Sequence, residues 1–104
     1  MSTDAVLTQT QPGAAGFDLD RPWQLHPQVS VRPERFGALL YHFGTRRLSF
    51  LKDRRLLAVV QRLGESPTAR AACTGAGIGP SEIGPYERAL ARLAETDMVR
   101  ERVP

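Results

Sequence analysis

Residues 36–63 read FGALLYHFGTRRLSFLKDRRLLAVVQRL, and this stretch predicts two strands followed by a helix. In its first half, Leu39, Tyr41 and Phe43 occupy every second position, which is the spacing of side chains on one face of a strand. After a short turn, residues 47–51 alternate again and form the predicted second strand.

The second half of the stretch has the pattern of an amphipathic helix. Asp53 is the predicted N-cap, because its carboxylate can accept hydrogen bonds from the free amides of a first helical turn. Apolar residues then recur at i, i+3, i+4 and i+7, namely Leu56, Val59, Val60 and Leu63. We expect Gly44 in the turn and Gly64 after the helix to take positive φ angles. A helix packed on the hairpin would stabilise a unit that is marginal alone.

Upstream of this stretch, Val29 and Val31 alternate with polar residues and predict a further strand. Pro27 and Pro33 bracket it, and proline is tolerated at the ends of strands. Because consecutive strands with short connections usually pair with their neighbours, we expect an antiparallel meander of three strands.

Two more helices are predicted downstream. Ser66 as N-cap and Pro67 at the first helical position begin the second helix. Gly84-Pro85 opens the third helix, one face of which carries Tyr86, Ala89, Leu90 and Leu93. The predicted fold class is therefore α+β and winged-helix-like, a three-stranded antiparallel sheet followed by three helices.

The length of 104 residues predicts one domain. We expect a disordered tail over residues 1–20, a folded domain over 21–99 and a frayed end over 100–104. No apolar run approaches the ~20 residues of a membrane span. The N-terminus lacks the pattern of a signal peptide, and the single Cys73 has no partner for an internal disulfide. We therefore expect a cytoplasmic protein without a membrane partner.

Positive charge is concentrated in the region that decides the fold. Residues 44–64 hold six basic residues and one acidic residue, a balance of 6 − 1 = +5, whereas the whole chain carries +3. A local basic field attracts acidic partners. Scattered surface charge is also normal in soluble proteins, and charge alone favours that plainer interpretation.

The residue types needed for metal or catalytic chemistry are sparse. His26, His42 and Cys73 do not show the spacing of a zinc site, so no metal and no cofactor are expected. We interpret His42 as an exposed strand residue and Cys73 as a small buried apolar group. No nucleophile motif or marked pair of carboxylates is present, which favours a binding module over an enzyme.

The chain resembles the peptide chaperones of the pyrroloquinoline-quinone type, which are recognition elements of ribosomally made peptide natural products. The resemblance covers about residues 23–99, and within the family the chain is most similar to the mycofactocin branch. The family pattern has an apolar strand ending in Tyr, a short strand running into an amphipathic helix closed by glycine, and two further helices. It is carried by Leu39-Leu40-Tyr41, Leu48, Leu56 to Gly64, Thr68, and Leu90 to Val99. Ser49 departs from the Asn that is frequent there.

The resemblance implies that the leader segment of a precursor peptide adds a strand beside the third strand, in a groove facing the third helix. On the strand, the implied peptide-binding residues are Arg47, Leu48, Ser49, Phe50 and Leu51. On the helix, they are Tyr86, Ala89, Leu90, Arg92 and Leu93. The implied partner enzyme is a radical S-adenosylmethionine maturase.

Three other interpretations remain open from the residues. Leu48, Phe50, Leu90 and Leu93 could be plain core residues. The chain could also be a DNA-binding winged-helix regulator, but its third helix balances Arg88 and Arg92 with Glu87 and Glu95, and a groove-reading helix should be basic. We therefore expect no nucleic-acid partner, and steep salt dependence would mark one. A bare dimerisation module would self-associate without a peptide.

Overall fold

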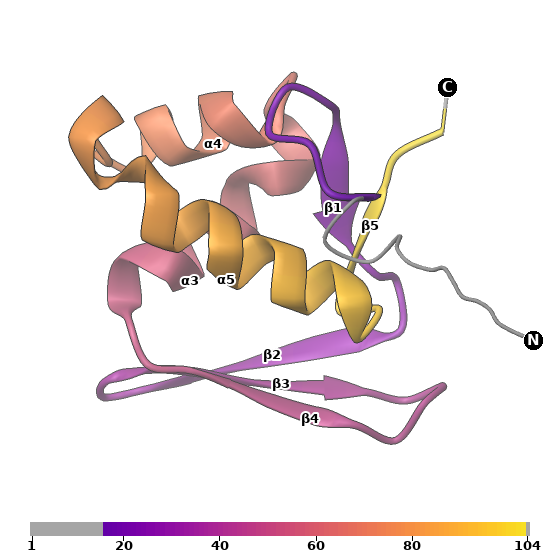
Figure 1. The fold of residues 1–104 in the computed structure, drawn as a ribbon. Helices are drawn as coiled ribbons and strands as arrows, with labels where there is room; N and C mark the ends of the chain where they lie inside the picture. The colour runs from indigo at the N-terminus through magenta and orange to yellow at the C-terminus, as the bar shows by residue number, and fades with distance from the viewer. Residues whose placement is uncertain (1–15, 104) are drawn as a thin grey trace, which may run out of the picture.

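Three strands form the larger sheet of the computed structural model, which describes residues 16–103 (Figure 1). They are β2 (Val29–Glu34), β3 (Gly37–His42) and β4 (Leu48–Leu51), and they pair in that order, antiparallel throughout. The predicted meander and the α+β class are confirmed.

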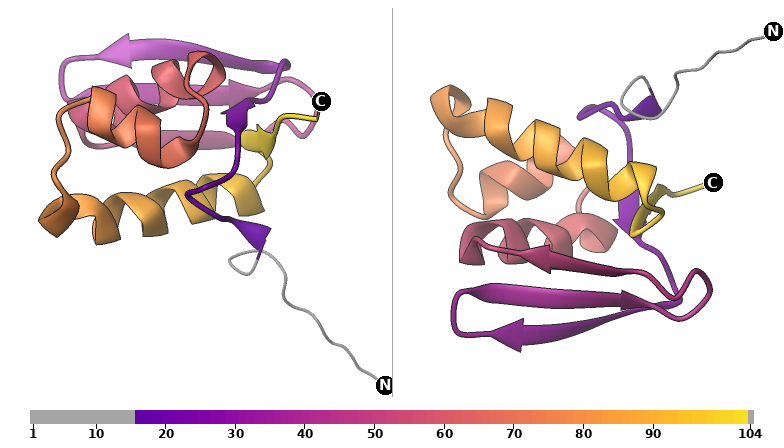
Figure 2. Two further views of the ribbon diagram at one scale, coloured as in Figure 1. Left: turned by 90° about the horizontal axis from the view of Figure 1, so that it is seen from above. Right: turned by 60° about the horizontal axis from the view of Figure 1, so that its bottom comes forward.

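Three α-helices follow the sheet within the described residues. They are α3 (Arg54–Arg62), α4 (Ala69–Gly75) and α5 (Ile83–Glu95), with short 3₁₀ turns at Leu63–Glu65 and Pro80–Glu82. All of them lie on the same side of the sheet (Figures 1 and 2). An antiparallel sheet is stable with one face packed and the other exposed to solvent.

The two faces of the sheet differ in what covers them. Ala38, Leu40 and His42 of β3 are buried on the inner face, towards the helices. Leu39 and Tyr41 point to the outer face, as the alternation of a strand requires. The expectation that His42 is exposed was therefore wrong, because its side chain is only 2% exposed.

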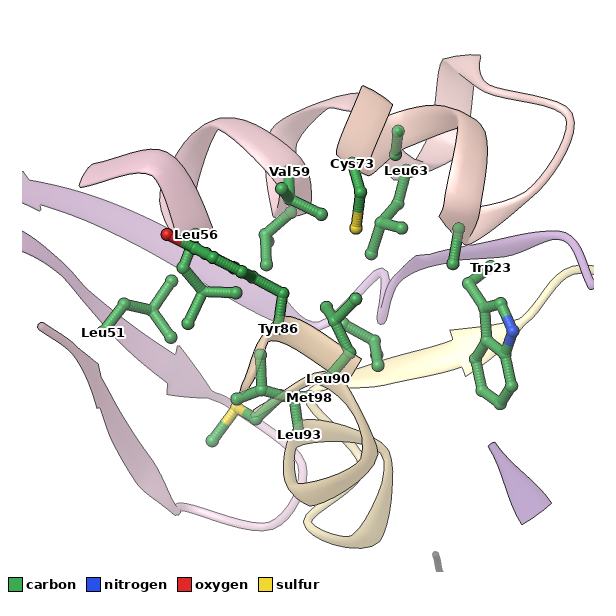
Figure 3. Packing of buried hydrophobic residues seen from close by; sticks show 14 of the residues in the cluster. Trp23, Leu51, Leu56, Val59, Leu63, Cys73, Tyr86, Leu90, Leu93 and Met98 are labelled. Atoms are coloured by element: carbon green, nitrogen blue, oxygen red, sulfur yellow. The ribbon is translucent and has the colours of Figure 1, made fainter. Parts of the chain in front are cut away.

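Between the inner face and the helices lies one apolar core (Figure 3). The predicted helical faces are buried in it, including Val59 and Val60 of α3 and Leu90 and Leu93 of α5. Cys73 of α4 is also buried, as predicted, and burial raises the pKa of its thiol. A protonated buried thiol is a poor nucleophile.

The predicted helix N-caps and glycine conformations were only partly right. Asp53 caps α3 as predicted, since its carboxylate accepts the Arg55 amide at 2.7 Å. The cap of α4 is Thr68 instead of Ser66. Gly44 and Gly64 do not have positive φ angles, and in the β3–β4 turn Arg46 has the positive value of 65°.

A second, two-stranded sheet was not predicted. β1 (Trp23–Leu25) pairs antiparallel with β5 (Val99–Glu101). Beyond β5, the Arg102 amide donates to the Pro22 carbonyl at 2.9 Å. The expected frayed end at 100–104 is thus ordered at least through Arg102.

Order also begins earlier than expected at the N-terminal end. Phe17 and Leu19 are buried, and the rings of Phe17 and Trp23 lie 4.7 Å apart. Asp20 is paired with Arg70 of α4 at 2.7 Å. Of the tail predicted over residues 1–20, residues 1–15 lie outside the described part of the chain. No helix within residues 16–103 is long and apolar enough to span a bilayer.

Candidate functional site

Strand β4 is one of the two edge strands of the larger sheet, the other being β2, because it pairs only with β3 within the described residues. The His42 amide donates to the Arg47 carbonyl at 3.0 Å. Groups that point to the neighbouring strand alternate along an antiparallel strand. Ser49 and Leu51, two and four residues after Arg47, therefore also turn their backbone N–H and C=O groups towards β3.

Leu48 and Phe50 consequently turn their backbone N–H and C=O groups to the open edge. On β3 they lie opposite Tyr41 and Leu39, and these two cross-strand pairs are the non-hydrogen-bonded pairs of the ladder. Unpaired backbone groups at an edge are a template for another strand. An incoming extended segment would pair with Leu48 and Phe50, while Ser49 stays bonded to the sheet.

A groove of about 230 Å³ runs between this edge and α5. Ser49, Phe50 and Leu51 line its strand side, and Leu56 of α3 forms part of its lining. The helix side is lined by Ala89, Arg92, Leu93 and Thr96. The lining is mostly apolar with arginine at the rim, and we call this hollow the edge groove.

A second hollow of about 590 Å³ continues the edge groove, because Leu56 and Ala89 line both. Its other walls are Lys52, Asp53, Arg55, Ser81, Glu82, Pro85 and Tyr86. Figure 3 shows Leu51, Leu56 and Tyr86 gathered at this end of the core. Together, the two hollows form a path along the β4 edge and the length of α5, from Glu82 to Thr96.

Tyr86 joins the two elements that enclose this path. Its hydroxyl donates to the Asp53 carboxylate at 2.5 Å, and the guanidinium of Arg55 lies 5.6 Å from the centre of its ring. Arg55 also pairs with Glu82 at 3.0 Å. These contacts fix α5 against the start of α3, which sets the width of the second hollow.

The pKa of the Asp53 carboxyl is perturbed by its neighbours. Partial burial raises its pKa, but hydrogen bonds from the Tyr86 hydroxyl and from the Arg55 and Leu56 amides outweigh that effect, so the pKa lies below its ordinary value of 3.8. Burial and the neighbouring Asp53 in turn raise the pKa of Tyr86, which keeps the hydroxyl protonated as a donor.

We therefore expect Asp53→Ala to lower the free energy of unfolding by about 1 kcal/mol at neutral pH, the usual cost of losing an N-cap. A depressed pKa contributes stability above the unfolded value of 3.8, and this is lost as pH falls through the lower folded pKa. The gap between wild type and variant should shrink in urea titrations below about pH 3. Asp53→Asn, which keeps a cap oxygen, should cost less, and a gap independent of pH would contradict this account.

The residues implied by the family resemblance fall into three groups in the structure. Ser49, Phe50, Leu51, Ala89, Arg92 and Leu93 line the edge groove, and Tyr86 lines its continuation. Arg47 and Leu48 lie at the start of the edge, and the Leu48 side chain points to the outer face. Leu90 has no exposed surface and lines neither hollow, so it packs the core instead of forming a wall.

The sequence did not assign eight lining residues of the path to the site, namely Leu56, Thr96, Lys52, Asp53, Arg55, Ser81, Glu82 and Pro85. Leu56 was assigned only to the core face of its helix, yet it lines both hollows. Lys52 follows β4 and lines the second hollow. The signal that could have found Lys52 and Leu56 is their position next to the edge strand.

The structure also brings together His26, His42 and Asp97, whose ligand-type atoms lie within 4.8 Å of one another. Both imidazole Nε2 atoms lie near the Asp97 carboxylate, at 3.6 and 3.5 Å. However, Nδ1 of His26 accepts the Gln28 amide, and Nδ1 of His42 accepts those of Gly44 and Thr45.

A nitrogen that accepts a hydrogen bond carries no proton, so each neutral ring is protonated on Nε2. The Nε2 atoms of His26 and His42 lie 3.6 and 3.5 Å from the Asp97 carboxylate, and that of His42 is buried without a hydrogen-bond partner among residues 16–103. A metal ligand would need a free lone pair at these atoms. The cluster ties the C-terminal end of α5 to the sheet, next to Thr96 of the edge groove. Asp97 adopts a positive φ of 63° in this arrangement.

Comparison with known proteins gives one consistent result. The family described as "Peptide chaperone MftB family" matches residues 22–100. A protein of Mycobacterium tuberculosis (strain ATCC 25618 / H37Rv) named "Peptide chaperone MftB" is 60% identical over 102 residues, covering 98% of this chain and 94% of that protein.

Two further proteins with the same name are also similar. That of Mycobacterium ulcerans (strain Agy99) is 58% identical and covers 88% of this chain and 84% of its own length. That of Mycolicibacterium smegmatis (strain ATCC 700084 / mc(2)155) is 53% identical, over 80% and 81% respectively. No solved structure matches the chain significantly.

Proposed function

The chain belongs to the peptide chaperone MftB family, and from this premise we propose that it binds the leader segment of a precursor peptide in the edge groove. The chain has a chaperone role, and that role is non-catalytic. The specific proposal adds that the bound leader is presented to a radical S-adenosylmethionine maturase in mycofactocin-type cofactor biosynthesis.

One observation supports the proposed binding mode above the others. The free backbone groups of Leu48 and Phe50 border a groove lined by Leu51, Leu56 and Leu93. An extended peptide added at a sheet edge gains affinity from main-chain hydrogen bonds and specificity from alternate side chains. The β4 edge would supply the main-chain hydrogen bonds, and the groove would accept the alternate side chains of the peptide.

The charges around the groove favour an acidic leader. Glu82 is ion-paired with Arg55, and the Asp53 carboxylate accepts the hydrogen bond of the Tyr86 hydroxyl, so both local carboxylates already have partners. Arg92 at the rim forms no ion pair within the described residues, and neither does Lys52. Electrostatic complementarity of this kind contributes more to orientation and on-rate than to affinity.

We expect Arg92→Glu to weaken leader binding about fivefold, which corresponds to ~1 kcal/mol for a solvent-exposed charge. Arg88→Glu is the matched control, because Arg88 lies one turn earlier on α5 and lines neither hollow. Arg62→Glu on α3 should also have little effect. Calorimetric titration of a synthetic leader into the three variants measures this, and equal weakening by all three would place the leader elsewhere.

Presentation requires the enzyme to engage the chaperone while the leader stays bound. We propose that this takes place in the cytoplasm, where a single buried thiol such as Cys73 suits a reducing setting. Turnover of the precursor core by the maturase should then depend on the chaperone at saturating leader concentration. A maturase that modifies the precursor equally well without the chaperone would contradict this role.

A further inference from the structure

The outer face of the larger sheet carries no covering element within residues 16–103 (Figures 1 and 2). It is apolar over β3 and β4, whereas β2 contributes the exposed Ser30, Arg32 and Glu34. Its centre consists of the cross-strand pairs Leu39–Phe50 and Tyr41–Leu48. Phe36 and Phe43 extend it at the two ends, and Phe43 packs edge-on against Tyr41 at 5.0 Å. We call these six residues the outer face.

Four members of this face are exposed to an unusual degree for large apolar side chains. The exposed fractions are 68% for Phe36, 59% for Phe43, 62% for Leu48 and 50% for Phe50. Single exposed apolar residues are common, but a contiguous apolar patch on a small domain marks an interaction site. The patch cannot be explained by the core, which lies on the opposite side of the sheet.

The charges around the outer face are predominantly positive. Residues 30–50 hold four arginines and one acidic residue, a balance of 4 − 1 = +3. Arg32 is paired with Glu34 at 3.2 Å. Within the described part of the chain, Arg35, Arg46 and Arg47 make no ion pair, and they stand at the two turns that bound the sheet.

We propose that the outer face is the docking surface for the modifying enzyme, through an enzyme surface with an apolar centre and an acidic rim. This inference rests on the proposed function, which supplies the enzyme. The basic rim favours an acidic partner. A second copy of this chain would place Arg46 and Arg47 against a surface of the same sign.

The geometry of β4 connects this surface to the bound leader. Along β4, the side chains of Ser49 and Leu51 point inward and those of Leu48 and Phe50 point outward. The backbone N–H and C=O groups of Leu48 and Phe50 face the edge of the sheet. Phe50 lines both the edge groove and a hollow on the outer face with Phe36 and Leu39. An enzyme on the outer face would therefore lie next to the leader without occupying its groove.

Arg46 provides a second reason to assign function to the rim. Its φ of 65° is unfavourable for a residue with a Cβ, and glycine would adopt it without strain. The side chain makes no ion pair within residues 16–103 that would offset this cost. The hairpin itself requires this φ, because the Arg46 amide donates to the His42 carbonyl at 2.7 Å. The choice of arginine where glycine fits more easily supports a use of its charge at the rim.

The test measures two titrations on each variant, one with the synthetic leader and one with the purified radical S-adenosylmethionine enzyme. Phe43→Ser should weaken enzyme binding about thirtyfold, as loss of an interface aromatic does, and leave leader affinity within about threefold, because Phe43 lines neither hollow of the leader path. Val103→Ser is the matched control, because Val103 is 88% exposed and lies outside the outer face. Arg46→Gly should weaken enzyme binding about fivefold while preserving or raising the melting temperature.

Enzyme binding that is unchanged in both Phe43→Ser and Arg46→Gly would overturn the proposal. So would sedimentation of the wild type as a dimer that Phe43→Ser dissociates, which would assign the face to a second copy. Retention of an oligonucleotide by the outer face would overturn it as well. If the leader fails to bind the wild type, the proposed function fails, while the enzyme titration without leader still tests the outer face.

Discussion

Phe50→Pro should weaken leader binding about a hundredfold or more while the protein still unfolds cooperatively. The Phe50 amide faces the open edge, so proline removes a donor that an added strand needs and leaves a peptide carbonyl without its partner. The lost bond and the unsatisfied group together cost about 3 kcal/mol. Because no β3–β4 hydrogen bond uses this amide, the sheet tolerates proline there, as edge strands do.

Phe50→Ala separates the backbone effect from the loss of the ring, and it should weaken the leader much less than Phe50→Pro. Ser49→Pro should behave differently from both, because the Ser49 amide faces β3 and its loss damages the sheet itself. Calorimetry gives the affinities, and thermal unfolding shows which variants remain folded. If Phe50→Pro binds the leader like wild type, strand addition at β4 is wrong.

Gly37→Ala should destabilise the fold by about 3 kcal/mol, the upper range for overpacking a tight site. A Cβ built at Gly37 would lie 1.8 Å from the Leu51 carbonyl oxygen and 3.2 Å from the Asp53 nitrogen, both backbone atoms. These atoms belong to the end of β4 and the cap of α3. The strand must therefore move, and the edge groove with it.

Gly64→Ala is the matched control, because nothing lies within 4 Å of a Cβ at that position and its φ is ordinary. That variant should be neutral or slightly stabilising. Chemical denaturation of both proteins measures the contrast. Equal stability of the two variants would mean that β4 and the α3 cap do not approach Gly37 as closely as the structure shows.

The elements were predictable because their periods are strong and local. Residues 36–63 contain both a period of two and a helical period, and they fold as β3, β4 and α3 as expected. The helical stripe of α5 contains Tyr86, Leu90 and Leu93, all buried. The short β1 and β5 are paired in space but lie at opposite ends of the described sequence. Strands of three residues carry too little local pattern to predict such a pairing.

The orientation of the larger sheet could not be predicted, because both faces of β3 are apolar. Ala38 and Leu40 alternate with Leu39 and Tyr41, so alternation alone does not show which set meets the helices. The contact with α3 and α5 decides it. The interpretation of His42 was wrong for the same reason, since its neighbours in space come from distant segments.

The candidate site was predictable only in outline. The family resemblance implied β4 and α5, and the structure encloses a groove between them. The strand alternation then separates the roles of neighbouring residues, with Ser49 bonded to β3 and Phe50 facing the edge. Leu90 shows the limit of a helical stripe, because its central position places it in the core.

Residue-resolved amide hydrogen exchange, measured by NMR with and without saturating leader peptide, tests the central claim most directly. We predict that the Leu48 and Phe50 amides exchange fast in the free protein and slow by at least about tenfold with the leader, as newly paired strand amides do. Ser49 and Leu51 should be protected in both states because they are bonded to β3. Unchanged exchange at Leu48 and Phe50, with protection appearing elsewhere, would contradict leader binding at the β4 edge.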